Sequence, residues 1–248
     1  NGTGLVPLTR LLKDNGVEDV TIVKEQDYPN GYFTSCPDSN PDIFEALEKG
    51  LALAKETGAD LMLATDPDAD RVGIAMRTPD GEYELVSGNE MGVLLLDYIA
   101  AGRKEAGTMP ERPVAVKSVV STQLADKVAE HYGVELRSVL TGFKWIARAP
   151  GLGFGYEEAI GFCPDPAHVR DKDGIATSVV AASLAAVLKA QGRSVWDELE
   201  RLARLHGLHV SSPLTFRVEE IEQIARGMAR LRAQPPSVPA GSPVVEVS

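Results

Sequence analysis

The chain has 248 residues, enough for one large domain or two ordinary ones, and 44% of them are hydrophobic and 6% aromatic, which suits a soluble α/β protein. Its formal net charge is -11 and no run of Lys or Arg occurs, so we expect no nucleic-acid partner. No segment has 18 consecutive apolar residues, and no signal peptide is recognisable, so we expect no contact with a membrane.

Two further features bear on compartment and completeness. The two cysteines, Cys36 and Cys163, lie far apart and form no CxxC pair, which fits a reducing, cytoplasmic compartment. The chain begins at Asn1 without a methionine and ends in the strand-like PVVEVS, so we expect a fragment of a longer protein. The oligomeric state is not predictable from these data.

The first third of the chain alternates helical and strand-like segments. Residues 5–15 are typical of a helix, residues 20–23 of a β-branched strand, and residues 27–40 of a loop. A helix is then expected to begin at Pro41 with Asn40 as its cap. The elements expected after this point are the rest of that helix up to Gly58 and strands at 60–64, 72–76 and 82–87.

A similar alternation restarts near residue 88 and again predicts an α/β unit. Its expected elements are helices at 89–101, 122–132 (capped by Ser121 or Thr122), 174–190 and 194–206, and strands at 113–120 and 134–139. The fold class is therefore two consecutive α/β units with mixed sheets flanked by helices. The remaining tail is expected to contain a helix at 218–233 and a linker after it.

The segment LMLATDPDADRVGIAM places three aspartates between two apolar strands. Asp66, Asp68 and Asp70 stand at alternate positions, so on an extended loop their carboxylates would point the same way. Three carboxylates this close repel one another unless a cation or protons neutralise them. The sequence therefore predicts a Mg²⁺ site, with Arg71 beside it to hold a phosphate.

Two other interpretations of this loop compete with a magnesium site. An EF-hand also opens with D-x-D-x-D, but it requires Gly at position 6, where Arg71 stands, and Glu at position 12, where Arg77 stands. A solvated acidic loop without a metal is the other alternative. It is disfavoured because the strands on both sides are expected to be buried.

Three motifs in the second half carry weaker signals. GYEEAIG places Glu157 and Glu158 between glycines, where carboxylates can accept hydrogen bonds from sugar hydroxyls. TGFKWIA places Lys144 just after a glycine at an expected helix start, which is typical of an anion site. VRDKDG places Arg170 and Lys172 before a helix. Each motif alone is also compatible with an ordinary polar surface.

Lys117 lies within the apolar strand VAVKSVV. A lysine in such a strand either extends its ammonium group to solvent from the edge of a sheet or points into a site where its pKa is perturbed. The sequence leaves these two alternatives open.

In their order along the chain, ATDPDADRVGIA, SGNEMG, TGFKWI, GYEEAIG and VRDKDG resemble the α-D-phosphohexomutase superfamily, the phosphoglucomutases and phosphomannomutases. The form GYEEAIG is similar to that of the phosphopentomutase-type subgroup. The resemblance implies that residues 1–87 are domain two, residues 88–205 domain three, and residues 206–248 a linker and the start of domain four. It also implies that the serine loop of domain one and the phosphate-binding loop of domain four have no counterpart here.

The resemblance implies a role for each matching residue. The three aspartates would bind Mg²⁺, and Arg71 would steady the transferred phosphate. The remaining roles would be proton transfer by Lys117, and contact with a phosphosugar by Glu157, Glu158, Thr141, Gly142, Lys144, Arg170 and Lys172. Where the family often has Ser, this chain has Ala159, which leaves the choice of sugar open.

The activity that the resemblance implies is transfer of a phosphoryl group between sugar hydroxyls through a phosphoserine and a sugar bisphosphate. The isolated segment is expected to be inactive, because the serine is absent. The alternatives are a non-catalytic module that binds a sugar phosphate or a divalent cation, and a purely structural domain.

Overall fold

The computed structural model describes residues 1–211, 218 and 220–235. The chain divides into two compact units, Asn1–Val210 and Ser211–Ser248, and each is described by itself. The first unit contains these elements: α1 (Leu5–Asp14), a 3₁₀ turn (Lys24–Gln26), α2 (Phe44–Thr57), β1 (Leu61–Thr65), β2 (Val72–Arg77), β3 (Tyr83–Val86), α3 (Gly88–Glu105), β4 (Val114–Ser118), α4 (Leu124–Tyr132), β5 (Glu135–Val139), α5 (Phe143–Ala147), β6 (Leu152–Glu157), β7 (Gly161–Cys163), α6 (Gly174–Ala190) and α7 (Val195–His206). In the second unit the structure describes α8 (Ile221–Ala233), which buries none of its residues.

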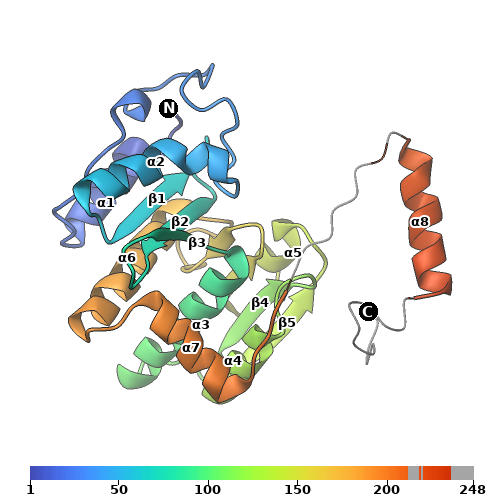
Figure 1. Ribbon diagram of the computed structural model, residues 1–248. Helices are drawn as coiled ribbons and strands as arrows, with labels where there is room; N and C mark the ends of the chain where they lie inside the picture. The colour runs from blue at the N-terminus through green and yellow to red at the C-terminus, as the bar shows by residue number, and fades with distance from the viewer. Residues whose placement is uncertain (212–217, 219, 236–248) are drawn as a thin grey trace. The chain divides into compact units, whose positions relative to one another are not determined.

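The first sheet has the order β1-β2-β3 and is antiparallel throughout (Figure 1). Its side chains alternate between two apolar layers, as the period of two in a strand requires. Met62 and Ala75 pack with Leu47 and Leu51 of α2 on one face. The opposite face, which includes Ile74, joins the main core of the unit.

The second sheet has the order β5-β4-β6-β7. The strands β5, β4 and β6 are parallel, and β7 returns antiparallel to β6, so this sheet is mixed. Parallel strands need crossover connections, and α4 and α5 supply them. The predicted fold class, α/β with helices flanking the sheets, is confirmed.

The main core is continuous between the two sheets. It contains Val72 and Ile74 of β2 together with Ala115 of β4, Phe154 of β6 and Phe162 of β7. Helix α6 also contacts β1, β2 and β7. The predicted domain boundaries at residues 87 and 205 stay predictions, but the segments on either side of residue 87 share one core.

Two local predictions were wrong. Residues 20–23 are not a strand, because no other described strand pairs with them and Val20 donates its N–H to Glu18 instead. Asn40 is not a helix cap, because α2 begins only at Phe44, after a turn over residues 41–43. Asn40 uses its side chain elsewhere, as described below.

Other elements begin a few residues away from the prediction. Helix α4 starts at Leu124, and its cap residue is Gln123, although Thr122 does accept a hydrogen bond from the Leu124 N–H (3.2 Å). Helix α8 starts at Ile221 instead of residue 218, and most of the predicted linker after it lies outside the described residues.

Among the described residues, no single helix is both long and apolar enough to cross a membrane. Helices α6 and α7 meet that test only when they are joined, and they bend by 87° at their junction. Both contribute side chains to the core, including Ala181 and Leu202.

Candidate functional site

The three aspartates lie in a tight turn between β1 and β2, not on an extended loop. The Ala69 N–H donates to the carbonyl of Asp66 (3.0 Å), and Ala69 has a φ of 61°, in the left-handed region. The Asp66 N–H then donates to the carbonyl of Arg71 (3.3 Å), which closes the turn where the strands begin to pair. The convergence of the carboxylates was predicted, but it arises from this turn and not from strand-like alternation.

Asp66, Asp68 and Asp70 each place one carboxylate oxygen within 4.8 Å of the other two. Asp66 is 2% exposed, whereas Asp70 is half-buried and Asp68 exposed, so the cluster has one dry side and one side open to water. Mg²⁺ prefers oxygen ligands, uses few carboxylates and keeps some water molecules. The donor set, three carboxylates with one side open to water, therefore fits such a cation.

The protein also places its own cations against these carboxylates. Arg71 Nε donates to Asp66 Oδ2 (2.8 Å), and Lys172 Nζ to Asp70 Oδ2 (2.5 Å). Burial raises the pKa of Asp66 and outweighs its contacts with Arg71. Burial opposes the charged form of Lys172, but the hydrogen bond and charge of Asp70 prevail and raise its pKa. The side-chain cations Arg71 and Lys172 thus neutralise part of the carboxylate charge that the sequence assigned to Mg²⁺.

The beginning of α6 lies against the same turn. The Gly174 N–H donates to the carbonyl of Ala69 (3.1 Å), while Asp173 caps the helix by accepting from Ile175 N (3.1 Å) and Ala176 N (2.9 Å). The positive end of a helix dipole favours nearby negative charge. Residues from the second half of the chain thus complete the surroundings of the acidic turn.

The second part of the site is the hairpin between β6 and β7. Glu157 is buried and its Oε1 accepts a hydrogen bond from the Gly142 N–H (2.7 Å). Glu158 turns the other way, and its Oε2 accepts from Ser118 Oγ (2.7 Å). Of the two predicted glutamates, Glu157 joins the TGFKWIA segment and Glu158 joins the end of β4.

The acidic turn and the hairpin are directly connected. Arg71 and Gly161 form an isolated antiparallel bridge, and the Val72 N–H donates to the carbonyl of Ile160 (3.4 Å). Ile160 has a φ of 55°, which is unfavourable for a β-branched residue and is held by burial of its side chain. Lys172 donates to Asp70 and packs its side chain against Gly161, so it contacts both parts of the site.

Lys117 is 3% exposed and stands in an inner strand, so it does not reach solvent from a sheet edge. Its Nζ forms an ion pair with Asp126 Oδ2 of α4 (3.1 Å) and donates to the carbonyl of Ser121 (3.2 Å). Its ammonium group is therefore held between β4 and α4.

The TGFKWIA segment forms the short helix α5, and Thr141 and Lys144 are exposed before and at its start. The Lys144 ammonium lies 5.3 Å from the centre of the Trp145 ring. Arg170 donates from Nε to the carbonyl of Ala147 (2.6 Å), and so secures the end of α5 instead of standing free.

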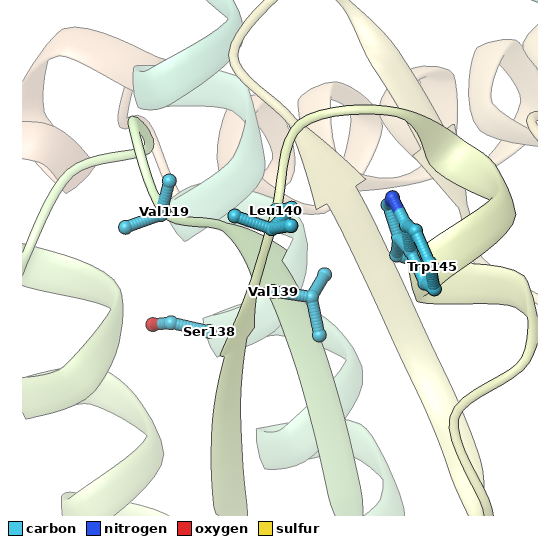
Figure 2. A pocket seen from close by; sticks show the side chains of 5 residues that line it. All are labelled: Val119, Ser138, Val139, Leu140 and Trp145. Carbon is cyan, nitrogen blue, oxygen red and sulfur yellow. The ribbon is translucent and has the colours of Figure 1, made fainter.

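A hollow of about 390 Å³ lies beside this segment. Figure 2 shows the side chains that line it. Its lining is mainly apolar and consists of Val119, Ser138, Val139, Leu140 and Trp145. None of the predicted metal ligands or hairpin glutamates lines it, so the hollow and the acidic turn are separate features.

Asn40 is a site residue that sequence reasoning missed. Its Oδ1 accepts a hydrogen bond from Arg71 Nη1 (3.3 Å) across 31 residues of sequence. The Asn-Pro-Asp sequence before a helix is a strong capping signal, and that signal concealed the long-range contact.

Comparison with known families gives matches over most of the chain. Residues 1–81 match phosphoglucomutase/phosphomannomutase alpha/beta/alpha domain II, and residues 87–205 match alpha/beta/alpha domain III.

Individual proteins agree with this result. The chain is 34% identical to the "Probable phosphomannomutase" of Haemophilus influenzae over 99% of the chain and 50% of that protein. It is 33% identical to a phosphoglucomutase of Staphylococcus aureus (strain MRSA252), over 95% of the chain and 44% of that protein. The chain thus spans about half the length of these curated relatives.

A crystal structure of a Thermus thermophilus protein, provisionally assigned as a phosphomannomutase, is similar with a TM-score of 0.65 and 28% identity. The similarity covers 84% of this chain and 44% of that one. None of these three proteins is named a phosphopentomutase, so the resemblance to the phosphopentomutase-type subgroup stays a prediction. The chain belongs to the phosphoglucomutase/phosphomannomutase family and carries its domains II and III.

Proposed function

We propose that this chain is the metal-binding and sugar-binding part of a phosphosugar mutase, which moves a phosphoryl group between sugar hydroxyls through a phosphoserine and a sugar bisphosphate. The observation that carries the proposal is the connection between the acidic turn and the glutamate hairpin. Lys172 pairs with Asp70 and packs its side chain against Gly161 of the hairpin, and Arg71 bridges to Gly161. A phosphate and the sugar that carries it would thus find their ligands side by side.

Asp66, Asp68 and Asp70 would hold Mg²⁺, which when bound supplies a Lewis acid that withdraws charge from phosphoryl oxygens. Arg71 adds a second positive group with a planar fork suited to phosphate. The transition state of phosphoryl transfer spreads negative charge over the equatorial oxygens, so positioning and electrostatic stabilisation dominate its catalysis.

Glu157 is the better supported of the two predicted sugar ligands. Its Oε1 is used by Gly142, and its Oε2 has no hydrogen-bond partner among the described residues. A carboxylate oxygen that has no donor and is open to solvent is suited to accept from a sugar hydroxyl. Glu158 is less suitable because Ser118 and Ser121 already donate to its carboxylate.

Lys117 was the residue predicted to transfer a proton, but its ammonium group is already paired with Asp126. Lys172 has its ammonium at the acidic turn, and its raised pKa keeps it charged. A charged lysine there can donate a hydrogen bond to an oxygen of the phosphoryl group, but it cannot accept the proton of the attacking hydroxyl, so proton transfer by Lys117 stays a proposal. We also propose substrate contacts for Arg170, Thr141 and Lys144.

The test is an NMR titration of the chain with glucose 1,6-bisphosphate in the presence of Mg²⁺, which detects binding into the millimolar range. We expect saturable shifts of the Gly142 amide, and an affinity about tenfold lower in Glu157→Gln, since a carboxylate accepts stronger hydrogen bonds than an amide. Glu84→Gln, at an exposed position of β3, is the matched control.

Two results would count against the proposal. One is an affinity for the bisphosphate no greater than that for inorganic phosphate, and the other is equal binding by Glu157→Gln and the unmodified chain. A non-catalytic binding module would give the same titration, so the two functions are separated by turnover of glucose 1-phosphate in a chimera that places this chain between the flanking segments of the Staphylococcus aureus phosphoglucomutase.

A further inference from the structure

Arg71 is held at two separate points of its guanidinium group. Nε donates to Asp66 Oδ2 (2.8 Å), and Nη1 donates to Asn40 Oδ1 (3.3 Å). Within the described residues no acceptor contacts Nη2. Two contacts fix both the direction and the rotation of the planar group, whereas one contact would leave it free to turn.

The identity of the Asn40 acceptor atom follows from its surroundings. The Asp42 N–H (3.2 Å) and Arg71 Nη1 (3.3 Å) both donate to the same side-chain atom of Asn40. Two donors that converge on one atom of an amide require that atom to be the oxygen.

The backbone that carries Asn40 is fixed against β2. Pro41 is buried, and its carbonyl oxygen would lie 2.2 Å from a Cβ atom at Gly73. Only a glycine at position 73 allows this approach. The segment that presents Asn40 is thus packed on the strand that begins immediately after Arg71.

The chemistry of the side chain at position 40 suits this task. An amide oxygen accepts from a guanidinium group without adding negative charge beside it. A carboxylate at the same position would hold Arg71 more strongly, but it would also repel a phosphate. Asn40 orients the guanidinium group without adding a further negative charge to those of Asp66 and Asp70, and the donors of Nη2 stay available for an incoming anion.

We propose that Asn40 is a positioning residue that sets the orientation of Arg71 toward a phosphoryl group. This inference rests on the proposed function of Arg71 as a phosphate ligand. Orienting a donor before the ligand arrives removes the entropic cost of ordering it during binding.

The experiment follows the Arg71 side chain directly. In the ¹³C,¹⁵N-labelled chain, NMR measures the rotation rate of the Arg71 guanidinium about its Nε–Cζ bond, and a parallel titration measures the affinity for inorganic phosphate with Mg²⁺ present. We expect rotation about tenfold faster in Asn40→Ala and phosphate affinity several-fold lower, about the loss of one hydrogen bond to a charged group. Asn30→Ala, in the same loop, should change neither, because among the described residues the Asn30 side chain bonds only within that loop.

Asn40→Asp separates positioning from simple structural support. It keeps the acceptor, so rotation should be as slow as in the unmodified chain, while its added charge should still weaken phosphate binding. Unchanged rotation in Asn40→Ala would overturn the proposal, as would faster rotation with unchanged phosphate affinity. If neither the unmodified chain nor any variant binds phosphate, the proposed function of Arg71 fails, and with it the proposal, even though the rotation rates can still show the Asn40–Arg71 contact.

Discussion

Lys172 has two opposing effects on the acidic turn. Its ammonium group neutralises part of the charge on Asp70, which lowers the repulsion among the three carboxylates. The same ammonium donates a hydrogen bond to a carboxylate oxygen of Asp70, and it adds positive charge where a metal ion would bind. Lys172 thus stabilises the turn without a metal and, if the proposed metal site is correct, would compete with the metal ion for Asp70.

The prediction at this scale concerns Lys172→Met. Methionine keeps an unbranched stem against Gly161, where the Lys172 side chain now packs, but it removes the charge. We expect tighter binding of Mn²⁺, by about fivefold or on the order of 1 kcal/mol, because the pair with Asp70 is partly exposed. Isothermal titration calorimetry measures this affinity.

The matched control is Lys55→Met, which removes an exposed partner of Glu82 and should leave the Mn²⁺ affinity unchanged. Weaker Mn²⁺ binding in Lys172→Met would show that the lysine organises the carboxylates more than it competes with the ion.

At the scale of elements, the hairpin between β6 and β7 depends on the first residue of α3. A Cβ atom at Gly88 would lie 1.9 Å from the carbonyl oxygen of Glu158 and 2.6 Å from its carbon. These are backbone atoms and cannot turn aside as a side chain can. Gly88 therefore permits the close approach that places Glu157 next to Gly142.

We predict that Gly88→Ala lowers the free energy of unfolding by about 1–3 kcal/mol, because the hairpin must move away from the helix. The same substitution at Gly102, in the same helix, meets no atom of the described residues within 4 Å. It should raise the free energy of unfolding by up to about 1 kcal/mol, since alanine favours a helix. Urea unfolding measures both variants. Equal effects of the two substitutions would show that the contact with Glu158 is unimportant.

The elements that sequence reasoning predicted well are those whose signals are local. Helix α2 ends at Gly58 in a left-handed conformation, as the glycine predicts. The strand expected at residues 20–23 failed for a non-local reason: β-branched residues favour a strand only where a partner strand lies beside them.

The same distinction explains what was predicted of the site. The acidic turn is contiguous, so its three aspartates and Arg71 were found from their spacing. The contacts of Asn40 with Arg71 and of Lys172 with Asp70 span 31 and 102 residues, and a single sequence carries no signal for such pairs. The direction of the Lys117 side chain could not be predicted, because it depended on whether β4 is an inner or an edge strand of its sheet.

At the scale of the whole first unit, three helices are joined away from the site by a partly buried polar network. Asp97 of α3 accepts from Tyr132 of α4 (3.0 Å) and from Arg201 of α7 (2.6 Å). Arg201 also pairs with Glu198 (2.7 Å). Buried polar groups stabilise a fold when they are all paired, so this network depends on the protonation of each member.

Tyr132 makes the network sensitive to high pH. Burial, and after it the charge of Asp97, raises the pKa of Tyr132 to about 12 from its ordinary value near 10. The unfolded chain therefore releases this proton at a lower pH than the folded chain does. Stability contributed by Tyr132 is fully present below pH 10 and is lost as the pH rises from about 10 to about 12.

We predict that the unmodified chain loses more stability between pH 8 and pH 11 than Tyr132→Phe does, by up to about 1 kcal/mol after allowance for partial exposure. Phenylalanine keeps the ring that packs against His131 but has no proton to lose. Urea unfolding at both pH values measures the difference, and titration of the other tyrosines and lysines cancels between the two proteins. If both lose the same amount, the Tyr132 hydroxyl contributes nothing to the joining of α3 and α4.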